Sequence, residues 1–245
     1  MRMRSTLIGA SLAAFVTVLA VVVSGQGRPP QQGQRAQNDG PPTLEQMRRT
    51  VASLRGNRIA TPNDYDRLTP EQQAYVKSIL SGPRASITGP LGVMMVSPTL
   101  GDLSQKALAY ARFSGDPGFG IVPPKLNELA ILVVAKHWSA EYVWNAHHSY
   151  GVRMGLPADL VEAIRVGRRP GPMEKDVEAV YNFATEFMTT RNVTDQTLQA
   201  AKAVLGGDRG VVDLVGTMGL YQISSMMVSL DQTPLGPGTK PYFAH

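Results

Sequence analysis

The chain has 245 residues with 24 basic and 19 acidic side chains, so its formal net charge at neutral pH is +5. This mild excess comes without a run of Lys or Arg and without interleaved aromatic residues, which argues against a nucleic-acid-binding role. The sequence contains no cysteine, and this excludes disulfides and every reaction that needs a thiol.

The N-terminus has the order of features of a secretory signal peptide. Arg2 and Arg4 precede a 17-residue uncharged apolar stretch from Leu7 to Val23, and small residues follow at Ser24-Gly25. We expect residues 1–25 to be removed and the protein to be exported, either periplasmic or secreted. The alternative is an uncleaved anchor, and only that anchor would give stable membrane insertion. The mature chain would keep 22 basic and 19 acidic side chains.

The remaining chain divides into a linker, one domain and a short tail. Residues 26–42 contain five Gln, four Pro and three Gly, so they lack the apolar surface that folding requires and form a predicted disordered linker. Residues 43–235 suffice for a single domain with a sizeable core. Residues 236–245 form a C-terminal tail.

The pattern of the domain is helical. Thr69 supplies an N-cap hydroxyl, Pro70 the first helical position and Gln72 the third, which predicts a helix over 70–80. The Pro- and Gly-rich residues 82–98 indicate a loop that could wall a pocket. No alternating β-branched run is bounded by turns, so the fold class is all-α. Further helices are expected over 98–113, 124–137, 139–154, 158–166, 173–190, 194–205 and 211–230.

Two of these helices have an informative composition. Residues 129–135 are apolar all round, which is typical of a helix buried on every side at the centre of a domain. The helix over 211–230 mixes small residues with Met and other large apolar residues, which suits either core packing or a subunit interface. Ser139 is the expected N-cap of the helix over 139–154.

A carboxylate and an imidazole form the candidate site. His147 shares an apolar helix face with Ala140, Val143 and Trp144. Glu128, in the first turn of the preceding buried helix, reaches the same face if the two helices pack as a hairpin. A carboxylate that orients an imidazole supports a general acid or base. The alternative is that both residues are purely structural, with Glu128 as a helix-dipole partner and His147 as a core residue.

Other chemistries lack their patterns. His148 points about 100° away from its neighbour on the helix, and no pair of His or Glu ligands lies four residues apart on one face, so we expect no metal. His148 is assigned to the surface or an interface. No phosphate-binding glycine loop and no nucleophile elbow occur in the sequence, so no cofactor is expected.

Several residues together resemble the carboxymuconolactone decarboxylase family, which includes the alkyl-hydroperoxidase D-like proteins. The resemblance covers residues 68–235 and implies a helical bundle built around a central helical hairpin, assembled as a homo-oligomer such as a trimer or hexamer. It is carried by Asn127-Glu128-Leu129-Ala130-Ile131-Leu132, then Tyr142, Trp144 and His147, then Gly155-Leu156 and Gly219-x-Tyr221.

The spacing within this resemblance implies roles for single residues. In the peroxidase branch, 12 residues separate a Glu from the first Cys of a Cys-x-x-Cys pair and 19 separate it from a His. Counted from Glu128, these positions are Ala140, Val143 and His147. The resemblance therefore implies that Glu128 and His147 are proton-relay positions in a cysteine-less member, and that thiol peroxidase activity is lost.

The decarboxylase branch needs no thiol. The residues expected to form the pocket beside His147 are Ala140, Glu141, Tyr142, Val143 and Trp144. Many members of this branch carry Tyr-Glu-Trp there, whereas this chain has Val143 in the middle and its nearest acid at Glu141. Two hypotheses follow. The first is a lyase- or isomerase-like enzyme acting on a small carboxylated or carbonyl compound, and the second is a non-catalytic oligomer that binds a small ligand in the same pocket. The candidate anchors for a substrate carboxylate are Arg112, Lys125 and Arg153.

Overall fold

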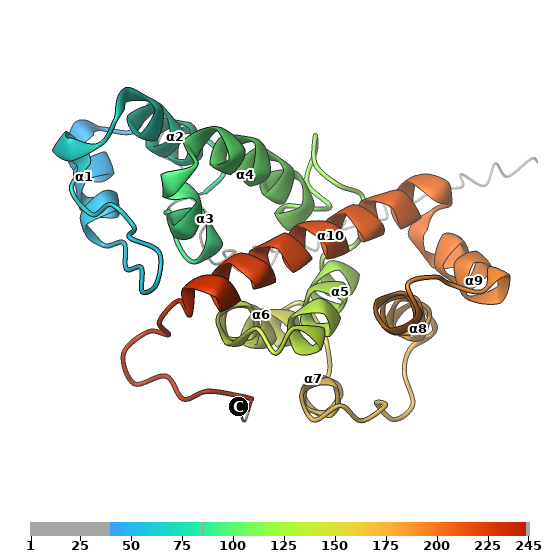
Figure 1. Cartoon of the computed structure of the whole chain (residues 1–245). Coiled ribbons are helices and arrows are strands. Elements are labelled where there is room, and N and C mark those ends of the chain that lie inside the picture. The colour runs from blue at the N-terminus through green and yellow to red at the C-terminus, as the bar shows by residue number, and fades with distance from the viewer. Residues whose placement is uncertain (1–39, 85, 244–245) are drawn as a thin grey trace, which may run out of the picture.

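Ten α-helices build the domain in the computed structural model, which describes residues 40–84 and 86–243 (Figure 1). No β-strand occurs in these ranges, which confirms the all-α prediction. The expected signal peptide, most of the linker and the last two residues of the tail lie outside the described residues. The helices are α1 (Leu44–Ala52), α2 (Pro70–Ser81), α3 (Pro90–Val93), α4 (Pro98–Arg112), α5 (Pro124–His137), α6 (Glu141–Arg153), α7 (Ala158–Arg165), α8 (Lys175–Thr190), α9 (Asp195–Leu205) and α10 (Asp208–Asp231).

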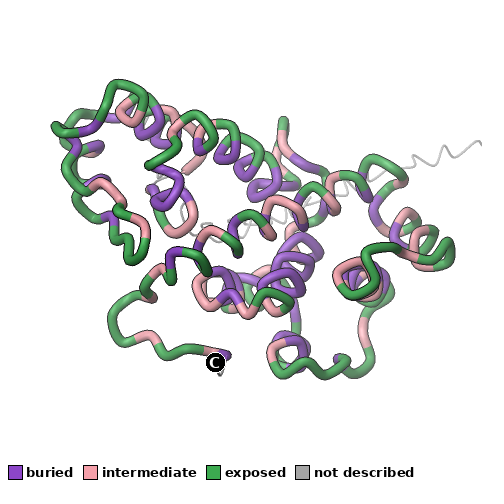
Figure 2. The backbone as a smooth tube through the Cα atoms, in the orientation of Figure 1, coloured by how far each residue is buried: buried purple, intermediate pink, exposed green. Residues whose placement is uncertain are grey.

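Helix α5 is the centre of the bundle. Every residue from Leu126 to Ala135 is buried, as the all-round apolar pattern predicts (Figure 2). It packs against α6, α8 and α10, and α6 follows it as the second arm of a hairpin (Figure 1). Gly151 permits a close approach of these arms, because a Cβ atom there would lie 3.2 Å from Leu132 and 3.0 Å from Leu156.

Helix α10 runs across the bundle and joins its two sides (Figure 1). It contacts α3 and α4 on one side, α5 and α6 below, and α9 near its own start. In the described part of the chain it is the one helix long and apolar enough to cross a membrane, and 44% of its most apolar window is buried inside the protein. Its packing is that of a core helix.

The helices depart from the sequence prediction in three main respects. α1, with a capping box between Thr43 and Gln46, was not predicted. The expected loop over 82–98 contains α3 and a 3₁₀ turn over Met94–Val96. Ser139 does not cap α6. Its φ of 47° places it in the left-handed turn that ends α5, and Ala140 takes the N-cap position without a side-chain hydrogen bond.

The C-terminal tail is fixed against α6. The backbone N–H groups of Tyr242 and Phe243 donate to the Glu141 carboxylate at 2.7 and 2.5 Å. The Tyr242 hydroxyl lies 2.7 Å from Nε2 of His148, and the Phe243 ring packs edge-on against Trp144. Glu141, Trp144 and His148 therefore hold the tail.

Candidate functional site

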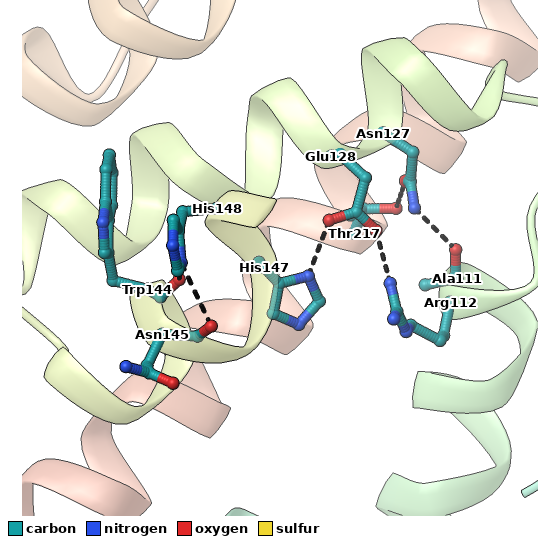
Figure 3. Close-up of polar contacts among 9 residues, drawn as sticks. All are labelled: Ala111, Arg112, Asn127, Glu128, Trp144, Asn145, His147, His148 and Thr217. Atoms are coloured by element: carbon teal, nitrogen blue, oxygen red, sulfur yellow. Dashed lines mark hydrogen bonds and ion pairs between the residues drawn. The ribbon is translucent and has the colours of Figure 1, made fainter. Parts of the chain in front are cut away.

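The centre of the site is a buried chain of three charged or polar side chains contributed by three helices. Arg112 ends α4, Glu128 lies in the second turn of α5 and His147 lies midway along α6. One carboxylate oxygen of Glu128 accepts a hydrogen bond from Arg112, and the other lies 2.7 Å from Nδ1 of His147 (Figure 3). The side chains of Arg112, Glu128 and His147 are only 5%, 2% and 8% exposed, so water screens these interactions very little.

Asn127 joins α5, the helix that carries Glu128, to α4 and α10. Its amide donates to the carbonyl oxygen of Ala111 on α4 at 3.0 Å, and it accepts from the hydroxyl of Thr217 on α10 at 2.9 Å (Figure 3). Both partners are buried, so these bonds satisfy groups that would otherwise be costly to bury. The result is a fixed position for Glu128 beside Arg112.

The geometry determines the tautomer of His147. Burial opposes ionisation of Glu128, but the charge of Arg112 and the hydrogen bonds from Arg112 and His147 hold its pKa below the ordinary value, so the carboxylate is ionised. A carboxylate accepts and does not donate, so Nδ1 of His147 carries the proton and Nε2 keeps its lone pair. Burial, reinforced by the positive charges of Arg112 and Arg84, lowers the pKa of His147 despite the opposing Glu128 charge. At neutral pH the imidazole is therefore neutral, and Arg112 alone balances the Glu128 charge.

A cavity of about 210 Å³ lies beside this chain. Arg112 and His147 line it, and the Tyr221 ring from α10 packs edge-on against the His147 ring at 5.0 Å between centroids. Burial raises the pKa of Tyr221 to about 12, so its hydroxyl stays protonated at neutral pH. The other lining residues are Arg84, Ser86, Thr88, Pro90, Leu91, Leu108, Tyr142, Val143, Ala146 and Ser224.

The structure places the sequence candidates in two groups. Glu128 lies against His147, and Tyr142 and Val143 line the cavity, as does Arg112. Ala140 and Trp144 are buried but are not part of the lining, and Glu141 holds the C-terminal tail.

Two of the three predicted carboxylate anchors lie outside the cavity. Lys125 forms ion pairs with Glu174 at 2.7 Å and Asp176 at 3.2 Å. The Arg153 guanidinium lies over the Tyr150 ring, 5.2 Å from its centroid, at the end of α6. Of the three candidate anchors only Arg112 lines the cavity, and its guanidinium is already paired with the Glu128 carboxylate.

Three lining residues that matter were not among the sequence candidates: Arg84, Tyr221 and Ser224. Arg84 belongs to the Pro- and Gly-rich segment for which a pocket wall was predicted, so its place in the sequence was a usable signal. Within residues 40–84 and 86–243, no cluster of three or more His, Asp or Glu side chains could hold a metal ion.

The comparisons with known proteins bear on the fold. No family model matches the chain, and no curated protein matches it. A solved structure of an uncharacterized peroxidase-related protein from Silicibacter sp. TM1040 is similar, with a TM-score of 0.58 and 14% sequence identity over 75% of this chain and 94% of that one. The chain thus has an alkyl-hydroperoxidase D-like helical fold. The likeness does not distinguish the carboxymuconolactone decarboxylase branch.

Proposed function

We propose that the protein catalyses proton transfer on a small carbonyl or carboxylated compound, as a lyase or isomerase of carboxymuconolactone decarboxylase type. His147 is the general acid or base, and Glu128 is a positioning residue that acts through it. The observation that carries the proposal is the hydrogen bond from Nδ1 of His147 to the buried Glu128, in a histidine whose ring lines a cavity.

This arrangement suits a base at neutral pH. The neutral imidazole has its proton on Nδ1, so Nε2 is free to take a proton from a ligand. The imidazolium that forms is stabilised by the adjacent Glu128 carboxylate. Tyr221, which keeps its proton, is within the same cavity as a hydrogen-bond donor for developing negative charge on a carbonyl oxygen.

Thiol chemistry is not part of the proposal. The sequence has no cysteine, and Ala140 and Val143 stand at the positions implied for the thiol pair. Both side chains are buried at the start of α6, so they shape the hydrophobic surroundings of His147. The peroxidase-related name of the similar solved structure belongs to that protein.

A non-catalytic binding protein is the alternative. The chain of Arg112, Glu128 and His147 is balanced in charge without any ligand, which is also the property of a triad that only stabilises the fold. In that case the cavity would bind a ligand without changing it.

Deuterium exchange separates the two functions. The purified protein is incubated in D₂O with a panel of lactone acids and keto acids, and incorporation of deuterium at carbon is followed by NMR. We expect catalysed exchange or turnover, a loss of roughly 10²–10⁴-fold in His147→Gln, and a smaller loss in Glu128→Gln. His148→Gln is the matched control, since that neighbouring ring contacts the tail and not the cavity. Binding without exchange in every case would favour the alternative.

We also propose that the chain is exported and forms a homo-oligomer. Supporting the second point, α4 and α10 pack against each other and carry several large apolar side chains that are exposed in the single chain. Leu103, Val212 and Leu230 are 66%, 68% and 58% exposed. Sedimentation at several protein concentrations tests the assembly.

A further inference from the structure

Arg84 is a cation without a counter-charge at the wall of the cavity. It lies between α2 and α3 and lines the same cavity as Arg112 and His147. Its Nε atom is buried and has no hydrogen-bond partner among the described residues, and no ion pair involving Arg84 occurs there. The guanidinium lies 5.8 Å from the centroid of the Phe113 ring, so the group that is left without an acceptor for its Nε–H is held at the wall of the cavity.

The charges around the cavity do not balance. Arg84 and Arg112 line it, whereas no Asp or Glu does. Within residues 40–84 and 86–243, the carboxylate that forms an ion pair with one of these two cations is that of Glu128, which Arg112 and His147 already share. Because His147 is neutral at neutral pH, the site as a whole carries one excess positive charge. A partly desolvated guanidinium without an anion is unfavourable, so an anionic ligand would gain the missing interaction.

We propose that Arg84 is the receptor for the carboxylate of a small monoanionic acid, which it holds with its carbon skeleton against His147. The planar fork of a guanidinium matches the two oxygens of a carboxylate. That the acid is a substrate rests on the proposed function, whereas its binding does not.

The rest of the lining suits such a ligand. Ser86 and Thr88 bring hydroxyl groups to the cavity, whereas the Ser224 hydroxyl donates to the Leu220 carbonyl oxygen. Leu91, Leu108 and Val143 provide an apolar wall for carbon atoms. A volume of about 210 Å³ limits the ligand to a small molecule. One uncompensated cation matches a single negative charge, so a dianion such as phosphate is disfavoured.

A structural role for Arg84 makes a different prediction. If the side chain served only to pack over Phe113, Arg84→Met would keep most of that packing and leave ligand affinity unchanged. A receptor role predicts the opposite: the methionine preserves the folded protein and removes the anion site. Arg84→Lys keeps the charge without the planar fork and should bind anions with intermediate affinity.

The experiment measures binding of benzoate, benzamide and inorganic phosphate by calorimetry, alongside the melting temperature. The control is Arg153→Met, which removes an arginine that also lies over an aromatic ring but outside the cavity. For the wild type we expect saturable 1:1 binding of benzoate, with benzamide and phosphate at least tenfold weaker. Arg84→Met should lose at least tenfold in benzoate affinity with a melting temperature that is equal to or above that of the wild type, because an uncompensated charge is removed, whereas Arg153→Met should bind as the wild type does.

The outcomes also separate this inference from the proposed function. Four results would each contradict the assignment of Arg84 as the carboxylate receptor. They are equal affinity for benzoate and benzamide, equal benzoate affinity in wild type and Arg84→Met, tighter binding of phosphate than of benzoate, and no saturable benzoate binding up to about 0.1 M. If wild type and His147→Gln both show the expected binding pattern but no compound turns over, the receptor role of Arg84 is supported and the proposed catalytic function is refuted. If His147-dependent turnover persists in Arg84→Met with unchanged KM, the proposed catalytic function is supported and the receptor role of Arg84 is refuted.

Discussion

Glu128 accepts a hydrogen bond from Nδ1 of His147 at 2.7 Å while its other oxygen binds Arg112, so one buried carboxylate sets the protonation of an imidazole and neutralises a guanidinium. The three side chains come from α6, α5 and α4. Their coupling gives the site a defined charge state at neutral pH, with Arg112 positive, Glu128 negative and His147 neutral.

Acidification should destabilise the protein in two steps. The pKa of folded His147 lies below its ordinary 6.5 through burial, so the unfolded chain binds a proton first and stability falls as the pH drops below about 6.5. Folded Glu128, lowered from 4.5, adds a second loss as the pH passes below that value. Denaturant unfolding of His147→Gln should lack the first step, whereas His148→Gln should keep it. Identical pH slopes in wild type and His147→Gln would contradict this assignment.

Arg112→Met should be strongly destabilising. It leaves the buried Glu128 without its permanent counter-charge, and breaking a buried pair from one side costs about 3–5 kcal/mol in the free energy of unfolding. Arg48→Met is the matched control, because Arg48 pairs with Asp66 at 2.9 Å with both side chains more than half exposed. The loss there should stay below about 1 kcal/mol. The Arg112 deficit should shrink at acid pH, where Glu128 can take up a proton. Equal losses in the two variants would show that the buried pair contributes no more than a surface one.

The sequence predicted those parts of the site whose residues lie close together along the chain. Glu128 and His147 are 19 residues apart on two helices of a hairpin, and helical periodicity placed both on facing surfaces. Arg84 lies in the segment for which a pocket wall was predicted, but no pattern indicated that its side chain would line the cavity. Tyr221 reaches the same cavity from a segment far along the chain, and no local pattern predicts that proximity. Tyr221 was visible as part of a motif but not as a neighbour of His147.

The anchors show the same limit. Lys125 stands near Glu128 in sequence, but its side chain extends to two acids at the start of α8, which no pattern around it indicates. Glu141 was expected near the pocket, yet its carboxylate accepts from backbone groups about a hundred residues later. Local periodicity predicts the face on which a side chain lies, whereas its partner depends on tertiary packing.

Thiol-dependent peroxide consumption should be absent. A thiolate nucleophile is required for that reaction, and no cysteine is present at Ala140, Val143 or elsewhere in the sequence. An assay with hydrogen peroxide and a thiol reductant, run against heat-killed protein, measures this. Peroxide consumption well above that background would contradict the prediction.

Export should remove residues 1 to about 25, because the basic start, the apolar stretch and the small residues occur in the order that signal peptidases require. Intact-mass analysis of protein from an extracytoplasmic fraction measures the mature N-terminus. A mass that still includes Met1 to Val23 would indicate an uncleaved anchor instead.

Gly89→Ala should alter the lining of the cavity in addition to straining the backbone. Gly89 has φ of 54° and ψ of −124° at the start of α3, and a Cβ atom there would lie 2.4 Å from the Tyr142 ring, which lines the cavity. The alanine therefore has to displace that ring as well as adopt a left-handed backbone. Gly118→Ala is the matched control, since its φ of 84° imposes similar strain but no atom lies within 4 Å of the added carbon.

The control should cost about 1 kcal/mol in the free energy of unfolding, the usual penalty for an L-residue at positive φ. Gly89→Ala should cost more and should also weaken benzoate binding, because a displaced Tyr142 changes the wall of the cavity. Denaturant unfolding and calorimetry of both variants measure these effects. If the two alanines lower stability equally and leave binding intact, the contact between Gly89 and Tyr142 does not shape the site.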